Sequence, residues 1–376
     1  MPSLPPVRLW IVFAVSAMSE SAYGDPDKHK TAADQRRIAT LIERLGHREY
    51  AERERAQIEL VRIGGPALAT LRAAYQANDV PEVVARSQVA ARTILLHSRT
   101  SKSTGLVMCV SDAGEYVMGS PTTERGRRAD EAQHVVRFDH PFLIGKYEVT
   151  QDEYQKVMKV NPSWFSQTGG GREKIGERGT GRYPVEQVSW FDAVEFCNRL
   201  SAADDFPEYY SMTDVKSDGN TISSATVRVR GGSGYRLPTE AEWEFACRAG
   251  TTGPFNSGRS LTGSEGNFKM IIGVGYGTEE KASLGRTGKV GGYKPNNWDL
   301  YDMHGNAAEW CDDWYDKDYY GKSPKDNPPG PEKGDHRVVR GGSWMGADSG
   351  CRSASRFWLA PSERKEYVGF RVVRKP

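Results

Sequence analysis

Residues 106 to 376 are rich in glycine and aromatic side chains and are interrupted by turn residues. The whole chain of 376 residues contains 40 glycines and 9 tryptophans. Such a segment cannot form long uninterrupted helices, because glycine is a poor helix former whose backbone freedom favours turns. Residues 106–376 are therefore predicted to form a loop-rich α+β domain of irregular structure, with short strands and few helices.

Capping boxes nevertheless mark three helices inside this segment. Each helix is preceded by Ser or Thr, and an acidic residue follows three positions later, in the pairs Thr150 with Glu153, Ser189 with Asp192 and Thr239 with Glu242. The hydroxyl accepts a hydrogen bond from the first helical turn, and the acid bonds back to the capping residue. Cys197 and Cys247 fall on the apolar faces of two of these helices, which predicts buried thiols. Short strands are predicted at residues 106–109, 116–118, 135–138, 142–147, 337–341 and 369–373.

Residues 31–98 differ from the rest, since they are rich in Ala, Arg, Leu, Glu and Ile and almost free of aromatic residues. Apolar residues recur at the spacing of one helix face, at Ile38, Leu41, Ile42 and Leu45. Further helices are predicted from Ala51 to Ile63, after Pro66 and after Pro81, with apolar positions that include Ile58, Val83, Val89 and Ile94. This pattern resembles one or two HEAT-like repeats, which usually act as contact surfaces.

The first 24 residues are expected to be a secretory signal peptide. Arg8 supplies a positive charge, an apolar run extends from Leu9 to Met18, and small residues follow at Ala22 and Gly24. That run is too short to cross a bilayer, and no later stretch is apolar enough, so no transmembrane segment is expected. The expected location is outside the cytoplasm, either periplasmic or extracellular.

The charge balance argues against a nucleic-acid partner. Lys and Arg number 51 and Asp and Glu number 49, which leaves a net charge of +2. A protein that binds a polyphosphate backbone usually carries a clear excess of positive charge. No nucleic acid is therefore expected among the partners.

Seven phrases occur in a fixed order along residues 106–375. They are "GEYVMGS", "FLIGKYEVTQDEYQKVM", "YPVEQVSWFDAVEFCNRLS", "YRLPTEAEWEFACRAG", "LYDMHGNAAEWCDDWY", "RVVRGGSW" and "VGFRVV". In these phrases and their order the segment resembles the formylglycine-generating, or sulfatase-modifying-factor, family. The resemblance implies an irregular, calcium-stabilised variant of the C-type-lectin-like fold. It also implies an oxidoreductase that converts a sulfatase cysteine to formylglycine with oxygen and copper(I), and hence a protein or peptide partner.

The resemblance places the active site in the segment that follows a Gly-Gly-Ser turn. Cys351 matches one of the two copper-binding cysteines and Ser343 matches the active-site serine, but Gly346 stands where the other cysteine is expected. Copper(I) prefers thiolate ligands, and glycine has no side chain to offer. Cys351 is then open to three interpretations: a catalytic thiol that works with the substrate's own cysteine, part of a pocket that binds without oxidising, or a buried core residue.

The resemblance also implies two calcium loops. The second corresponds to "DMHGNAAE", in which Asp302 and Glu309 offer carboxylates and Gly305 and Ala307 offer carbonyl oxygens. The first corresponds to Asn267 and Phe268 in the phrase "GNF". Calcium is thus the expected cofactor, while copper(I) depends on whether one cysteine suffices.

Disulfides known in the eukaryotic members of the family do not carry over. Cys197 and Cys247 each match one partner of a pair, but their mates fall on Val372 and Arg356. Both thiols are therefore predicted to be free.

Two functional hypotheses follow from the sequence. In the first, the chain is an exported oxidoreductase-like modifier of a protein cysteine, with Cys351 and Ser343 in its active site. In the second, it is a non-catalytic C-type-lectin-like binding module, and the helical segment at residues 31–98 is a second contact surface.

Overall fold

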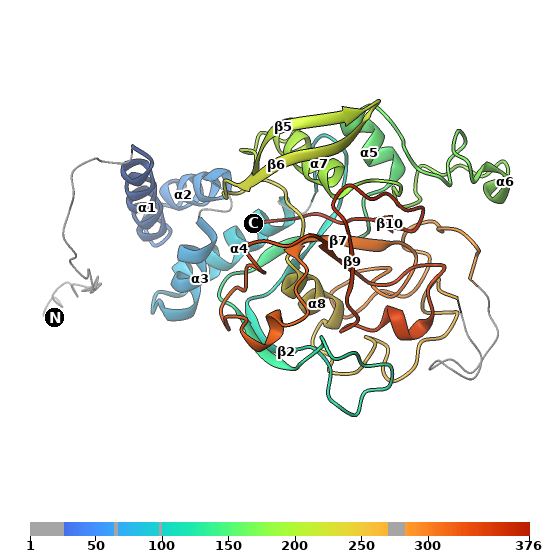
Figure 1. Cartoon of the computed structure of the whole chain (residues 1–376). Coiled ribbons are helices and arrows are strands. Elements are labelled where there is room, and N and C mark those ends of the chain that lie inside the picture. The colour runs from blue at the N-terminus through green and yellow to red at the C-terminus, as the bar shows by residue number, and fades with distance from the viewer. Residues whose placement is uncertain (1–25, 64–66, 98–99, 270–282) are drawn as a thin grey trace, which may run out of the picture.

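The computed structural model describes residues 26–63, 67–97, 100–269 and 283–376. The N-terminal part is a group of helices at one side of the molecule (Figure 1). These helices are α1 Pro26–Arg44, α2 Tyr50–Ile63, α3 Leu68–Ala77 and α4 Pro81–His97. The expected signal peptide, residues 1–24, lies outside the described residues.

The helical group has a hydrophobic core of its own. The predicted face of α1 is confirmed, because Ile38, Leu41, Ile42 and Leu45 are all buried in that core. Two other apolar positions of the predicted helices lie outside that core: Ile58 on α2 and Val89 on α4 are 62% and 51% exposed. Helix α4 instead buries the face that contains Val83, Ser87, Ala90, Ala91 and Ile94.

The C-terminal part combines helices with short strands, so the predicted mixed α+β class is confirmed. The helices are α5 Gln151–Met158, α6 Arg172–Ile175, α7 Trp190–Ala203, α8 Glu240–Arg248 and the 3-10 turns η2 Tyr319–Gly321 and η3 Asp348–Cys351. The strands are β1 Met108–Ser111, β2 Gly114–Met118, β3 His134–Phe138, β4 Phe142–Gly145, β5 Tyr210–Asp218, β6 Thr221–Val229, β7 Ala308–Trp314, β8 Arg337–Arg340, β9 Phe357–Leu359, β10 Val368–Gly369 and β11 Val373–Arg374.

The strands form four small sheets in the described residues. Strands β1, β4 and β11 form one sheet, and β10, β7, β8 and β9 form another in that spatial order. Two hairpins, β2 with β3 and β5 with β6, complete the set. In the four-stranded sheet, Ala308 of β7 pairs with Val368 of β10, and Val339 of β8 pairs with Phe357 of β9.

The strand predictions are confirmed in place but not always in extent. The stretch predicted as one strand at 369–373 is two strands, because β10 pairs in parallel with β7 while β11 pairs antiparallel with β4. Between them Phe370 packs into the core and Arg371 turns to a buried carboxylate. The strand predicted at 106–109 begins at Met108 instead.

All three predicted capping boxes are present. The hydroxyls of Thr150, Ser189 and Thr239 each accept a hydrogen bond from the backbone N–H three residues on. The acidic partners bond back to the capping residues, so each box is reciprocal.

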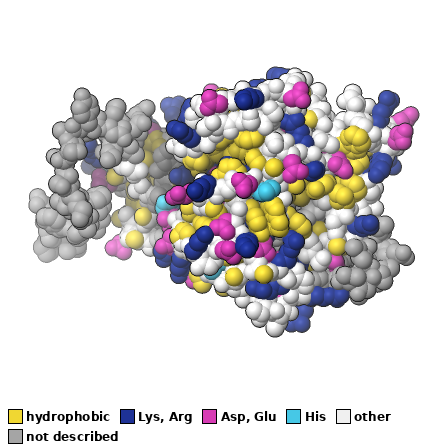
Figure 2. Space-filling model, in the orientation of Figure 1, with side chains coloured by type: hydrophobic (Ala, Val, Ile, Leu, Met, Phe, Trp, Pro, Cys, Tyr) yellow, Lys and Arg dark blue, Asp and Glu magenta, His cyan; other side chains and the backbone are white. Residues whose placement is uncertain are grey.

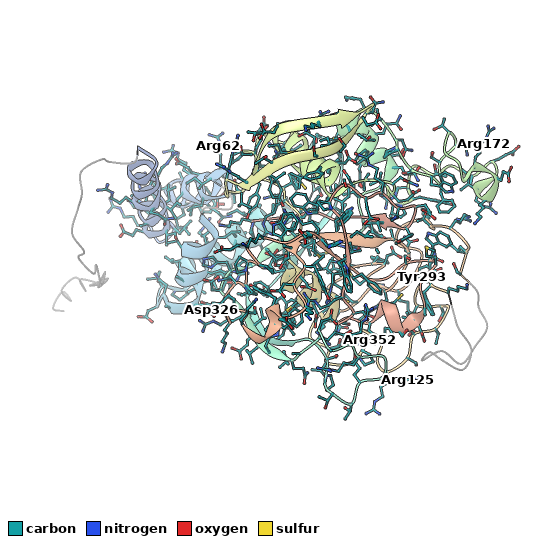
Figure 3. All side chains as sticks on the ribbon, viewed as in Figure 1. Arg62, Arg125, Arg172, Tyr293, Asp326 and Arg352 are labelled. Atoms are coloured by element: carbon teal, nitrogen blue, oxygen red, sulfur yellow. The ribbon has the colours of Figure 1, made fainter. Side chains whose placement is uncertain are left out.

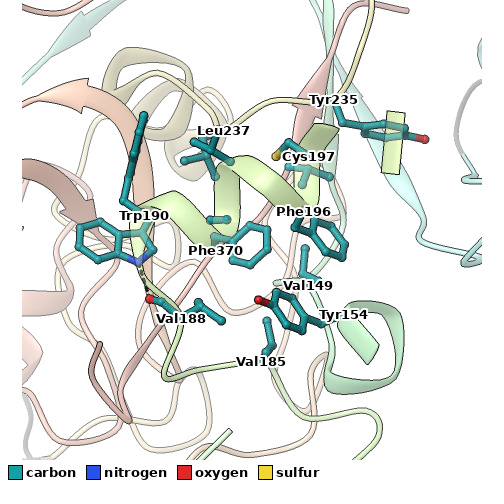
Figure 4. Packing of buried hydrophobic residues seen from close by; sticks show 14 of the residues in the cluster. Val149, Tyr154, Val185, Val188, Trp190, Phe196, Cys197, Tyr235, Leu237 and Phe370 are labelled. Atoms are coloured by element: carbon teal, nitrogen blue, oxygen red, sulfur yellow. Dashed lines mark hydrogen bonds between the residues drawn. The ribbon is translucent and has the colours of Figure 1, made fainter. Parts of the chain in front are cut away.

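Two large hydrophobic clusters support the C-terminal part. One surrounds α7 and contains Cys197, Trp310 and Phe370 (Figure 4). The other surrounds α8 and contains Trp243 and Cys247. Neither Cys197 nor Cys247 forms a disulfide, which confirms the prediction that both thiols are free.

In the part of the chain that the structure describes, none of the helices has both the length and the apolar character needed to cross a bilayer.

Candidate functional site

A cavity of about 550 Å³ opens over one face of the four-stranded sheet. Its floor is apolar and includes Ala308, Val339, Phe357 and Leu359. Its wall is the segment from Gly342 to Ser355, which connects β8 to β9. We call this cavity the sheet pocket. Figure 2 shows hydrophobic side chains gathered near the centre of this view of the molecule, with charged side chains around them.

The sheet pocket is lined by Ser343, the predicted active-site serine, and by Gly346, which stands where a second copper-binding cysteine was expected. The Gly346 N–H donates to the Ser343 carbonyl oxygen at 3.0 Å, which closes a tight turn. A Cβ atom added at Gly346 would lie 3.6 Å or more from its nearest neighbours, all of them atoms of Ser343. The backbone therefore has room for a side chain at position 346, and glycine is not required there by packing.

Cys351 does not line the sheet pocket. It ends η3 as a fully buried residue, in a small cluster with Phe255, Leu261 and Phe268. The Sγ atom lies 3.6 Å from the carbonyl oxygen of Ala347, to which it donates. The pocket-lining Gly342 packs against it, since a Cβ at Gly342 would lie 2.5 Å from that Sγ.

The Cys351 thiol is held in its protonated form. Burial, and next the charge of Asp348, raise the pKa of this thiol far above its usual value. A nucleophile or copper ligand must be a thiolate, and reactive cysteines have lowered pKa values in accessible sites. The environment of Cys351 has the opposite character.

A histidine behind Cys351 does not act as its base. His304 Nδ1 donates to the Cys351 carbonyl oxygen at 2.7 Å, and Nε2 accepts from the Asn256 N–H at 3.0 Å. Burial lowers the pKa of His304 to about 4, so the ring is neutral at physiological pH. Its hydrogen bonds position the end of η3 and leave the thiol without a proton acceptor on the ring.

Two arginines supply the charged part of the pocket lining. Arg352 is buried and pairs with Glu124 at 2.6 Å and with Glu131 at 2.7 Å. Its guanidinium also donates to the Gly126 carbonyl oxygen, on the loop that carries Arg125. Figure 3 labels Arg352 and Arg125. The other arginine, Arg128, is exposed on the same loop.

The predicted second calcium loop is buried, and one of its carboxylates is already occupied. Glu309 receives two hydrogen bonds from Arg371, at 2.6 and 2.7 Å, and one from Trp243 Nε1 at 2.8 Å. Both members of the Glu309–Arg371 pair are fully buried. This carboxylate is therefore engaged as an internal counter-ion rather than as an open ligand.

Asp302 has an unused oxygen and an acidic neighbour that the sequence reasoning missed. Its Oδ2 accepts from the Gly291 N–H at 2.7 Å, while Oδ1 has no hydrogen-bond partner among the described residues. The neighbour is Glu148, whose Oε1 accepts from Asn306 Nδ2 and whose Oε2 likewise has no partner among them. Glu148 lies between Tyr147 and Val149 in "KYEVT". An acidic residue flanked by apolar ones in this way could have indicated a buried carboxyl group.

Burial raises the affinity of both carboxyl groups for a proton. Burial is the largest cause for both: it raises the pKa of Asp302 to about 6 and that of Glu148 well above its usual range. The negative charge of Asp302 raises the pKa of Glu148 further. A buried pair of carboxyl groups is stable only if it shares a proton or binds a cation.

The predicted first calcium loop packs against the second. The Asn267 carbonyl oxygen accepts from the Asn306 N–H at 2.8 Å, and a Cβ at Gly305 would lie only 2.4 Å from that oxygen. The Asn267 side chain is used within the protein, since Oδ1 accepts from the Leu284 N–H and Nδ2 donates to the Arg286 carbonyl. Phe268 is buried beside Cys351.

No group of three or more His, Cys, Asp or Glu side chains is arranged to hold a metal ion within the described ranges. A cation at the Asp302 loop would therefore use the two carboxylates of Asp302 and Glu148 together with carbonyl oxygens.

Comparisons with known proteins show the family to which the chain is similar. The family model described as "Sulfatase-modifying factor enzyme 1-like domain" matches residues 95–376. "Chaperone protein LppX" of Paenibacillus barcinonensis is 33% identical over 222 residues, which are 54% of this chain and 69% of that protein. "Formylglycine-generating enzyme" of Streptomyces coelicolor is 41% identical over 149 residues, 38% of this chain and 47% of the enzyme. The chain thus spans less than half the length of that enzyme.

Solved structures show the same similarity over a longer stretch. "Treponema denticola variable protein 1" superposes with a TM-score of 0.57 and 30% identity, covering 74% of this chain and 98% of that one. PvdO from Pseudomonas aeruginosa superposes with a TM-score of 0.56 and 28% identity, covering 74% of this chain and 97% of that one.

Proposed function

The chain belongs to the sulfatase-modifying factor enzyme 1-like domain family, and from this premise we propose that it binds a polypeptide segment in the sheet pocket without copper-dependent oxidation. We also propose that the domain is a variant of the C-type-lectin-like fold and that residues 1–24 direct export. In this proposal the helical group, which we take as HEAT-like, adds a second contact surface.

The single observation that carries the proposal is the separation of Cys351 from the pocket. Ser343 and Gly346 line the cavity, but the thiol lies behind Gly342, fully buried and protonated. With glycine at 346, the pocket lining offers no thiolate to copper(I), which needs soft ligands. The residues present do not fit copper, whereas an apolar floor with polar walls suits a bound side chain.

A neutral apolar peptide containing Phe and Leu is expected to bind the wild type and Gly346→Ala alike. Gly346→Phe should bind it at least about tenfold more weakly, because the ring fills the cavity without a backbone clash. Fluorescence polarisation of the labelled peptide measures this.

With copper(I) and oxygen, a peptide containing Cys-x-Pro-x-Arg should keep its mass in the presence of either wild type or Cys351→Ser.

Conversion of that peptide's thiol to an aldehyde by the wild type, abolished in Cys351→Ser, would contradict the proposal and establish the oxidoreductase hypothesis. Gly346→Cys serves as a control for the pocket. Oxidation in this variant alone would mean that the wild-type site lacks only the second thiolate.

We further propose that calcium binds at the Asp302 loop. The support is the pair of buried carboxylate oxygens, one from Asp302 and one from Glu148, that have no donor among the described residues. The family pattern implies the carbonyl oxygens of Gly305 and Ala307 as further ligands, and Glu148 takes the place of Glu309, whose carboxylate is paired with Arg371. Calcium takes such oxygen ligands and would neutralise the two carboxylates, which stabilises the loop. Asn267 and Phe268 remain a prediction of the sequence.

Asp302→Asn is expected to change stability in opposite directions with and without calcium. Without calcium at neutral pH, it should stabilise the fold by about 2 kcal/mol, since it removes a carboxylate whose pKa is raised to about 6. In the wild type, the proton bound by the carboxyl pair stabilises the fold in acid, and this stabilisation is lost as pH rises through about 6. With calcium, the wild type should gain about 2–3 kcal/mol at saturating ion, and the variant should not.

Urea unfolding in chelator and in calcium measures both effects. Asp326→Asn is the control, because Asp326 is about half exposed and pairs with Arg137. A wild type whose unfolding midpoint is the same in chelator and in calcium would refute the calcium proposal.

A further inference from the structure

The charged lining of the sheet pocket is positive. Arg128 and Arg352 line it, and none of the described lining residues is Asp or Glu. Arg352 is neutralised by Glu124 and Glu131. The charge that remains for a ligand is that of Arg128.

Arg128 is held at the pocket by aromatic rings. Its guanidinium carbon lies 5.5 Å from the ring centre of Phe357 and 5.6 Å from that of Trp358. Its Nη1 donates to the Arg356 carbonyl oxygen at 3.1 Å. No ion pair between described residues includes Arg128, so its charge is available.

The two rings are themselves unusually accessible. Phe357 and Trp358 are 37% and 38% exposed, and Met345, which also lines the pocket, is 44% exposed. Exposed aromatic and thioether side chains around an apolar floor are typical of a surface that contacts another polypeptide. The cation and the rings therefore form one continuous contact area.

We propose that the sheet pocket selects an acidic, apolar polypeptide segment. An aliphatic or aromatic side chain occupies the floor formed by Val339 and Leu359, and a neighbouring Asp, Glu or terminal carboxylate pairs with Arg128. This inference rests on the proposed function and specifies its ligand class. A peptide that carries arginine beside its apolar side chain should not be selected by this pocket, because Arg128 would repel the second positive charge.

The test uses three labelled peptides with the same Phe-Leu core, flanked by Glu, by Gln or by Lys. In fluorescence polarisation with the full chain, the Glu peptide should bind roughly fivefold more tightly than the Gln peptide, and the Lys peptide more weakly than either. Arg128→Gln should abolish the difference between the Glu and Gln peptides, and added salt should reduce it. Arg228→Glu, which lowers the positive charge on the exposed end of β6 instead, should preserve the Glu preference.

The outcomes separate the two proposals. Equal binding of all three peptides, with Gly346→Phe still blocking the Gln peptide, would overturn the charge preference and leave pocket binding intact. Tightest binding of the Lys peptide, or a preference that survives in Arg128→Gln, would also overturn the inference. If none of the peptides binds the wild type, pocket binding itself fails and the ligand class fails with it.

Discussion

Arg371→Leu is expected to destabilise the protein by about 3–5 kcal/mol or to prevent folding. Arg371 and Glu309 are both fully buried, and two hydrogen bonds join them. Arg371 also donates to the carbonyl oxygens of Gly145 and Tyr301. Leucine would leave a buried carboxylate without its counter-ion and two carbonyl groups without a donor, and each of these losses is costly.

Urea unfolding followed by tryptophan fluorescence measures this loss. Arg137→Leu is the matched control, because its partner Asp326 is about half exposed, as is Arg137 itself, and such pairs contribute at most about 1 kcal/mol. If both variants unfold at the same urea concentration as the wild type, the buried pair is not a stabilising element. If Arg371→Leu does not fold, Arg371→Lys keeps the charge and should recover part of the stability.

Gly342→Ala is expected to destabilise the protein by about 2–4 kcal/mol, whereas Gly346→Ala should be close to neutral. Gly342 has a φ of +68°, and a Cβ there would lie 2.5 Å from Cys351 Sγ and 3.0 Å from the α-carbon of the same residue. Gly346 has no such conformation and no such close neighbour. Two glycines of the same pocket wall thus differ in whether the fold requires them.

Thermal unfolding of the two variants gives the comparison. Adding Cys351→Ala to Gly342→Ala should restore part of the loss, because it removes the sulfur. The left-handed backbone at position 342 and the close approach of the backbone at position 351 would remain, so the recovery should be incomplete. Equal melting temperatures for Gly342→Ala and Gly346→Ala would show that Cys351 does not pack against Gly342 as described.

The features that the sequence predicted correctly are local. The capping boxes at Thr150, Ser189 and Thr239 depend on residues three positions apart, and the buried face of α1 depends on a helical repeat. Such signals are complete within one or two turns of chain.

The features that escaped prediction depend on partners far away in the chain. Glu148 joins Asp302 across more than a hundred residues, and the surroundings of Cys351 come from Phe255, Leu261 and Phe268. The stretch predicted as one strand at 369–373 forms two strands, because its two ends pair with strands of different sheets. No periodicity within a segment reports which distant element will cover it.

Those last strands determine when the domain can fold during synthesis. Strand β11 completes the sheet of β1 and β4, β10 completes the sheet of β7 to β9, and Arg371 neutralises Glu309. The four-stranded sheet therefore stays unfinished until residue 369 has left the ribosome, and the three-stranded sheet until residue 374 has done so. The helical group, whose core is formed from residues 38 to 94, can assemble long before that. Translation thus presents a folded N-terminal part joined to a growing chain whose two sheets must wait for residues 368–374.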